Sequence, residues 1–192
     1  MKKFVSVVLT MVLMMTMFAG CGSSAAPAET EATATLPGSA LEILETVWAD
    51  YADEEKFAII GGNIEANIMD APGTYDPAYA ENMTYNLLVP ADRIADIAEA
   101  ASMIHMMNAN NFTCGAFRMA EGANAEEFAA AMQQAVQSNP WICGFPETLH
   151  IAAFGSEYVL VAFGVNDAMN PFTTHLAAVY PDAKTVVNEA IA

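Results

Sequence analysis

Positive charge is scarce in this chain. Its 192 residues include 6 lysine and arginine residues against 23 aspartate and glutamate residues, so the formal net charge at pH 7 is −17. A protein that binds nucleic acid needs a basic surface to neutralise phosphates, and a basic surface is also what attracts anionic lipid. The composition therefore argues against a nucleic-acid partner and against a domain that lies flat on an anionic membrane.

Catalytic and ligand-binding motifs are also missing. The sequence contains no GxSxG, HExxH, GxGxxG, P-loop or EF-hand pattern. The acidic stretch at residues 70–76 includes a proline and lacks the ligand spacing of a calcium loop. We therefore predict no catalytic residue, no metal ligand and no cofactor, and we expect binding rather than catalysis. Two alternatives stay open: a surface hydrolase or redox enzyme, and a metal-handling protein.

The one long apolar run lies at the N-terminus. Lys2 and Lys3 precede an uncharged apolar stretch at residues 4–18, shorter than the roughly 20 residues that a membrane-spanning helix needs. This order is typical of an export signal. The stretch ends in Phe18-Ala19-Gly20-Cys21, which resembles the lipobox of bacterial lipoproteins, although phenylalanine stands where leucine is usual. The resemblance implies lipid attachment to Cys21 and removal of residues 1–20.

These features predict three segments and a location. Residues 1–20 are a lipoprotein signal peptide, residues 21–39 are a lipidated cysteine with a disordered linker of small and polar residues, and residues 40–192 are a single globular α+β domain. Two acyl chains on one cysteine give stable anchoring. We expect the protein on the extracytoplasmic face of the cell membrane, where four basic and 23 acidic residues leave a net charge of 4 − 23 = −19.

The first half of the domain is predicted to be helical with one long loop. Ser39 and Glu42 have the spacing of a capping box, and the apolar residues that follow have helical spacing. Glycines and prolines at residues 61–79 predict mostly loop. Pro90 suits the first turn of a second helix that ends near Asn108.

The second half has a clearer pattern. Strands are expected at residues 112–119, 148–154 and 157–163, with helices after Asn124 and from Pro171. Residues 183–190 are expected to form a last strand or a short helix, and we take the strand. Gly155-Ser156 predicts a two-residue hairpin turn, which would place His150 opposite Val161. The β-α-β-β-α-β order is that of ferredoxin-like folds. We therefore predict an α+β fold with a ferredoxin-like arrangement at residues 112–190 and an N-terminal helical extension.

A family resemblance covers about residues 80–192. It rests on the segment Met106-Met107-Asn108-Ala109-Asn110-Asn111-Phe112-Thr113, on the capped helix that follows, and on Tyr158-Val159-Leu160-Val161. These segments resemble an uncharacterised family, a domain of unknown function, in exported lipoproteins of Gram-positive bacteria. The resemblance implies a cell-surface lipoprotein of unknown molecular function and assigns no active-site residue.

Cys114 and Cys143 are the other two cysteines. Thiols outside the cytoplasm often pair, so a disulfide between them is possible, and two separate buried thiols are the alternative. A redox role is poorly supported because no CxxC motif is present.

The segment Met103-Ile104-His105-Met106-Met107 combines thioether and imidazole groups that suit copper. On the predicted helix, however, His105 would face away from the methionines, so we predict no metal site there. The remaining expectation is a membrane-anchored lipoprotein whose domain binds a protein, a cell-wall fragment or a small molecule.

Overall fold

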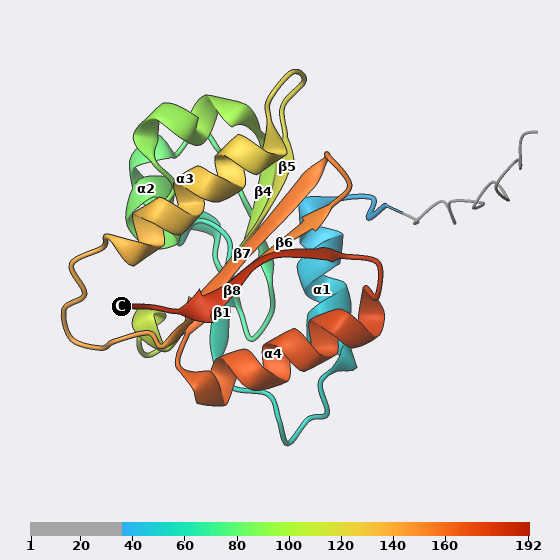
Figure 1. Cartoon of the computed structure of the whole chain (residues 1–192). Coiled ribbons are helices and arrows are strands. Elements are labelled where there is room, and N and C mark those ends of the chain that lie inside the picture. Colours follow the sequence, from blue (N-terminus) through green and yellow to red (C-terminus); the bar gives the residue numbers. More distant parts are fainter. Residues whose placement is uncertain (1–35) are drawn as a thin grey trace, which may run out of the picture. The chain divides into compact units, whose positions relative to one another are not determined.

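The structure, a computed structural model, describes residues 36–192 (Figure 1). The predicted signal peptide and Cys21 lie outside the described residues. The described strands are β1 (Ile59–Gly61), β2 (Ile68–Met69), β3 (Gly73–Tyr75), β4 (Ile97–His105), β5 (Phe112–Met119), β6 (Thr148–Phe154), β7 (Tyr158–Gly164) and β8 (Lys184–Ala190). The helices are α1 (Ala40–Asp50), α2 (Ala80–Leu87), α3 (Ala125–Gln137) and α4 (Asn166–Val179), with short 3₁₀ turns η1 (Ile64–Ala66), η2 (Ala91–Asp96) and η3 (Ala109–Asn111).

All eight described strands join one antiparallel sheet. Its order is β2-β1-β4-β5-β7-β6-β8, and β3 pairs with β4 outside this path. Helices cover both faces, because side chains alternate along β4, β5, β6 and β7 between two separate apolar clusters. The α+β class predicted from the sequence is confirmed.

The two clusters define the layers. The first cluster packs α1 and α4 against one face of the sheet, and its large members include Ile43, Leu44, Val47, Trp48, Ile59, Met103, Phe112, Leu160 and Phe172. The second packs α2 and α3 against the other face, and its large members include Tyr75, Met83, Leu87, Phe117, Phe128, Met132, Leu149, Ile151 and Val159. The site described below lies on the second face.

The predicted helix from Pro90 to Asn108 is wrong. The short turn η2 occupies Ala91–Asp96, and β4 then crosses the centre of the sheet. One edge of β4 pairs with β3 and β1, and the other pairs with β5 along almost its whole length. Alanine and methionine are good helix formers, but small side chains such as Ala100 and Ala101 also let both faces of a central strand be covered closely, and both are fully buried. Tertiary pairing here overrides local propensity.

The order β-α-β-β-α-β is present at residues 112–190, but the sheet differs from a ferredoxin-like one. In that fold the last strand pairs with the first and both helices cover one face. Here β8 pairs with β6, and β4 takes the place beside β5. The connections β5-α3-β6 and β7-α4-β8 each join two parallel strands, and both move in the same direction across the sheet. Their first strands, β5 and β7, are antiparallel to each other. Since such crossovers are right-handed, α3 and α4 must lie on opposite faces, as they do.

Local signals located two helix starts correctly. The Ser39 side chain accepts a hydrogen bond from the Glu42 amide, and the Asn124 side chain accepts bonds from the Glu126 and Glu127 amides. The start of α4 was placed too late, because the helix begins at Asn166 and contains Pro171 in its interior.

Two further predictions need correction. The β6–β7 hairpin pairs Phe154 with Tyr158, so its loop has three residues rather than two, and His150 lies opposite Ala162 rather than Val161. Residues 61–79 are mostly loop, as predicted, and contain the short strands β2 and β3. β8 is a strand, as the predicted order of elements requires. Within the described residues, no helix combines the length and apolar character needed to span a membrane.

Two chain segments meet closely at Gly61. A Cβ added at this position would lie 2.2 Å from the Gly73 nitrogen and 2.4 Å from the Pro72 carbonyl carbon. Both are backbone atoms at the place where β1 and β3 follow each other along the same edge of β4, so they cannot move apart without disturbing strand pairing.

We expect Gly61→Ala to lower the free energy of unfolding by about 2–4 kcal/mol, because backbone overlap cannot relax by side-chain rotation. The matched control is Gly122→Ala, where φ is +82° but nothing lies within 4 Å of the added Cβ, so only backbone strain of about 1 kcal/mol is expected. Urea unfolding of both variants measures the difference, and equal losses would contradict the close approach.

Candidate functional site

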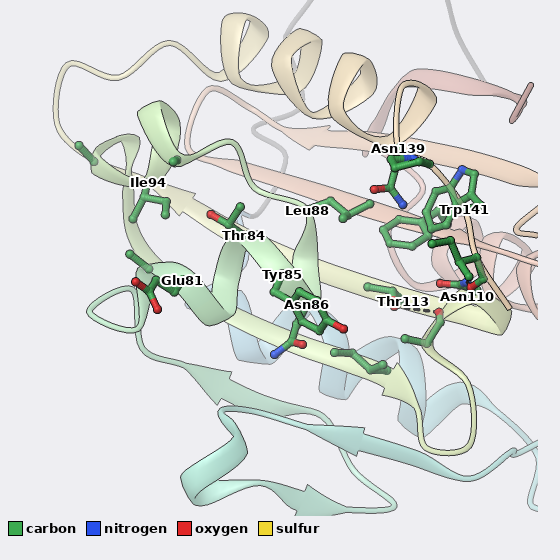
Figure 2. Close-up of a pocket in the computed structure, with 18 residues that line it drawn as sticks. Glu81, Thr84, Tyr85, Asn86, Leu88, Ile94, Asn110, Thr113, Asn139 and Trp141 are labelled. Atoms are coloured by element: carbon green, nitrogen blue, oxygen red, sulfur yellow. Dashed lines mark hydrogen bonds between the residues drawn. The ribbon is translucent and has the colours of Figure 1, made fainter. Parts of the chain in front are cut away.

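A large cleft opens on the face covered by α2 and α3. Its volume is about 1080 Å³, slightly above the about 300–1,000 Å³ common for small-molecule sites. The floor is formed by Ile104 of β4, Thr113 of β5 and Phe163 of β7, side chains that point to the same face of the sheet. Figure 2 shows the lining side chains converging from segments that are far apart in the sequence.

One wall of the cleft is α2 and the turn after it. Met83 and Leu87 are buried in the second cluster and hold the helix against the sheet. A different helix face, carrying Glu81, Thr84 and Tyr85, therefore lines the cleft.

One hydrogen bond and the end of the helix define this wall. Asn86 Nδ2 donates a hydrogen bond to the Tyr75 hydroxyl at 2.9 Å. Leu88 ends the helix in a left-handed conformation, with φ +58°, and its side chain also lines the cleft. The turn η2 then continues the wall with Ile94.

The opposite wall is the segment after α3. Trp141 lies over Phe163, with ring centroids 5.5 Å apart, and so extends the apolar floor upward. Its indole N–H is buried without an acceptor among the described residues. Such a donor costs about 1–3 kcal/mol, so a shift of the ring that provides an acceptor would be favourable.

Asparagine side chains hold this second wall in place. Asn110 Nδ2 donates to the carbonyls of Ile142 and Gly144, at 3.2 and 3.0 Å, and Asn108 Nδ2 donates to the Cys143 carbonyl at 3.1 Å. These bonds fasten the segment to the loop between β4 and β5. Without regular secondary structure of its own, the wall depends on these amide contacts for its position.

The rim of the cleft carries exposed apolar side chains. Tyr85, 84% exposed, and Ile142, 76% exposed, line the cleft, and Phe145, 72% exposed, follows Ile142 in the same segment. Met107, 78% exposed, adjoins Asn108, which bonds to the same segment. Scattered exposed apolar residues are ordinary, but a group beside a cleft is typical of a binding surface.

Charge around the cleft is low and of one sign. Among the described residues that line it, Glu81 is the only ionisable side chain apart from the phenol of Tyr85, and none is basic. The other polar groups are the amides of Asn86, Asn110 and Asn139, two threonine hydroxyls and the Trp141 indole. The cleft can therefore offer apolar contact and amide hydrogen bonds, with a single carboxylate at one end.

The two cysteines of the domain differ in solvent exposure. Cys114 is completely buried on β5 in the first cluster, and burial raises the pKa of its thiol well above the ordinary value. Cys143 is exposed in the segment after α3, and both thiols are free. The structure therefore forms neither the possible disulfide nor the pair of buried thiols. A buried thiol in apolar surroundings is inert.

The side chains of the Met-His segment lie in different surroundings. Met103 points into the first cluster, whereas Met106 and Met107 are exposed beyond the end of β4. His105 stacks on Phe57, and its Nδ1 accepts hydrogen bonds from the amides of Met107 and Asn108. Within residues 36–192, no group of three His, Cys, Asp or Glu side chains has the geometry to hold a metal ion.

A second polar cluster joins two helices. His175 of α4 places Nδ1 2.8 Å from Asp50 Oδ2 and Nε2 3.6 Å from Glu55 Oε2, and its ring stacks on Tyr51 at 4.1 Å. Burial raises the pKa of the Tyr51 hydroxyl far above its ordinary value. These contacts connect α4 to the end of α1, on the face opposite to the cleft, and we interpret the cluster as structural.

Sequence reasoning did not find the cleft. None of Tyr85, Asn110 and Trp141 belongs to a motif that is typical of a binding site. The sequence pattern predicts no helix or strand for the part of the wall that carries Glu81. The available signal was the apolar run at residues 141–145 between a predicted helix and a predicted strand, where a solvated loop would be polar.

Comparison with known proteins adds no information on this site. No protein-family model matches the chain, and neither a curated protein nor a solved structure matches it. The resemblance to exported lipoproteins therefore stays a prediction.

The pH dependence of stability can test whether His150 is buried as a neutral imidazole in the sheet. It lies on β6 opposite Asn188 of β8, its Nδ1 is buried without a partner among the described residues, and burial lowers the pKa of its imidazole. The unfolded chain, with a pKa near 6.5, therefore binds this proton more tightly than the folded chain. The contribution of neutral His150 to stability is complete above pH 6.5 and is lost as pH falls below it.

We expect wild-type stability to fall between pH 7.5 and 5.5 relative to His150→Gln, with a difference in slope of at most about 1.4 kcal/mol per pH unit, the limit for one proton. Urea unfolding at several pH values measures it. His105→Gln serves as the comparison at a half-buried histidine. Parallel pH profiles for wild type and His150→Gln would contradict the burial of a neutral imidazole.

Proposed function

We propose that this chain is a membrane-anchored lipoprotein of the cell envelope whose domain binds a ligand in the cleft between α2 and the segment after α3. The cleft itself carries the proposal. A concave, mainly apolar site with a few polar groups at its rim is the usual form of a small-molecule site. The expectation that the bound object is a small molecule rather than a whole protein rests on the volume of the cleft, about 1080 Å³.

The residues that line the cleft favour binding over catalysis. Acid–base or nucleophilic chemistry needs a nucleophile and a base within hydrogen-bond reach of each other. The hydroxyl of Thr113 donates to the Ala109 carbonyl at 3.0 Å, and the lining residues within the described part of the chain include neither histidine nor cysteine. One carboxylate on a largely apolar surface is suited to recognition.

The tether proposal rests on Phe18-Ala19-Gly20-Cys21 and is compatible with the position of the cleft. Leu36, the first described residue, lies beside Gly155, since a Cβ on Gly155 would be 3.2 Å from Leu36 Cδ2. Phe163, under Trp141, lies near the other end of the seven-residue strand β7. At about 3.3 Å per residue these ends are roughly 20 Å apart. A lipid on Cys21 would therefore hold the domain by the end remote from Trp141.

We expect labelled fatty acid to be incorporated into the wild-type chain and into Cys143→Ser, but not into Cys21→Ser. The control removes the exposed thiol of the domain, so it separates lipidation at the lipobox from acylation of any accessible cysteine. Fractionation should place the wild type with the membrane. Absence of label from the wild type, or its recovery from the cytosol, would contradict the tether.

We expect Ala109→Trp to reduce ligand binding about tenfold or more, which corresponds to 1.4 kcal/mol. Ala109 lines the cleft and is exposed, so a large side chain fills the site without disturbing the core. Ala177→Trp is the control, because Ala177 is exposed on α4, which packs on the other face.

The measurement is native mass spectrometry of each full chain, recovered from its own envelope in mild detergent. Bound ligand should accompany the wild type and Ala177→Trp and be lost from Ala109→Trp. Equal ligand content in all three chains would place binding elsewhere.

A further inference from the structure

We infer that the cleft selects a ligand that carries a positively charged nitrogen on an apolar body. This inference rests on the proposed function and specifies its ligand class. An amine of this kind could be a free arylalkylamine or the N-terminal residue of a hydrophobic peptide. Both present the same ammonium group beside an apolar side chain.

The charge distribution supports a cation. Glu81 lies at one end of the cleft and Trp141 at the other (Figure 2). Glu81 makes no ion pair with a described residue, and no lysine, arginine or histidine lines the cleft within the described part of the chain. An anionic ligand would therefore lose its hydration without finding a counter-ion.

Basic residues elsewhere do not compensate for this carboxylate. Arg93 follows α2 closely in the chain, but its guanidinium already faces Asp96 at 3.4 Å, Glu127 at 3.8 Å and Asp92 at 4.0 Å. Arg118 is 3.0 Å from Glu99. The surroundings of the cleft therefore remain negative.

Aromatic and apolar groups suit the rest of such a ligand. Tyr85 lies four residues after Glu81 on the same face of α2 and is exposed. An ammonium at Glu81 can therefore also contact the tyrosine ring face, a favourable cation–π arrangement. The apolar body then extends along Leu88 and Phe163 towards Trp141.

The test uses ligands that share an apolar body and differ in the charge of the terminal group. Phenylethylamine, phenylethanol and phenylpropanoate supply a cation, a neutral group and an anion on similar apolar bodies. A hydrophobic tripeptide amide with a free N-terminus, compared with its N-acetylated form, represents the peptide source. Isothermal titration of the full chain in non-ionic detergent measures affinity, and Trp141 emission in a Trp48→Phe background, whose fold is checked by circular dichroism, reports occupancy of the cleft.

The expected result is preference for the amine or for the free peptide N-terminus, with binding of that ligand reduced about three- to tenfold by Glu81→Gln. The variant should leave phenylethanol binding unchanged. Glu45→Gln, which neutralises an exposed carboxylate on α1, should change neither. Each ligand partitions into the detergent to the same extent for all variants, so a difference in affinity between variants reports the contribution of the cleft.

Three outcomes would overturn the inference: tightest binding by the anion, equal binding by all three charge types, or no effect of Glu81→Gln on the amine. The first two would still show an occupied cleft, so they would contradict the ligand class and leave the binding role in place. Binding of no ligand in the series, together with equal native ligand content in Ala109→Trp and wild type, would contradict both the ligand class and the binding role of the cleft. Binding by the peptide alone, or by the free amine alone, supports the shared chemistry and identifies its source.

Discussion

Hydrogen bonding along both edges of β4 is the constraint on which the rest of the structure depends. The strand joins the short strands β1 and β3 on one edge to the long strands β5 and β7 beyond the other. Its small residues, including Ala100 and Ala101, are fully buried and allow helices to cover both faces closely. Ser102 adds a further connection, because its buried hydroxyl accepts a hydrogen bond from the Gly62 amide at 2.9 Å. Without this strand, the cleft would lose Ile104 from its floor, and β1 and β3 would have no partner in the main sheet.

The cleft follows from the way in which the second face is covered. α2 and α3 are packed by their own apolar stripes, but the sheet between them continues under a gap that the segment after α3 only partly closes. Amide side chains of Asn108 and Asn110 hold that segment through its backbone carbonyls. The result is an apolar floor with an amide-rich rim. The single carboxylate among the lining residues, that of Glu81, is consistent with the acidic composition of the chain. The proposed preference for a cationic ligand thus has its physical origin in the scarcity of basic residues.

Sequence-based prediction succeeded where a local signal and the tertiary environment agree. The caps at Ser39 and Asn124, the apolar stripes of α1 and α3, and the β-rich runs of β5, β6, β7 and β8 are all present in the structure. It failed at residues 97–105, because a run of alanine, methionine and isoleucine satisfies a helical period and a buried strand equally well. It also failed on helix placement relative to the sheet, since the order of elements does not say whether β8 pairs with β5 or with β6.

Composition and local patterning alone were enough to predict an acidic α+β domain and to locate most helices and strands of its second half. The central position of β4, the opposite faces of α3 and α4, and the cleft arise only from tertiary contacts. The physical reason is that capping, turn chemistry and hydrophobic periodicity act over a few neighbouring residues. The cleft instead brings together Glu81, Thr113 and Trp141 from three separate segments, and only the packed sheet determines that distant residues meet there.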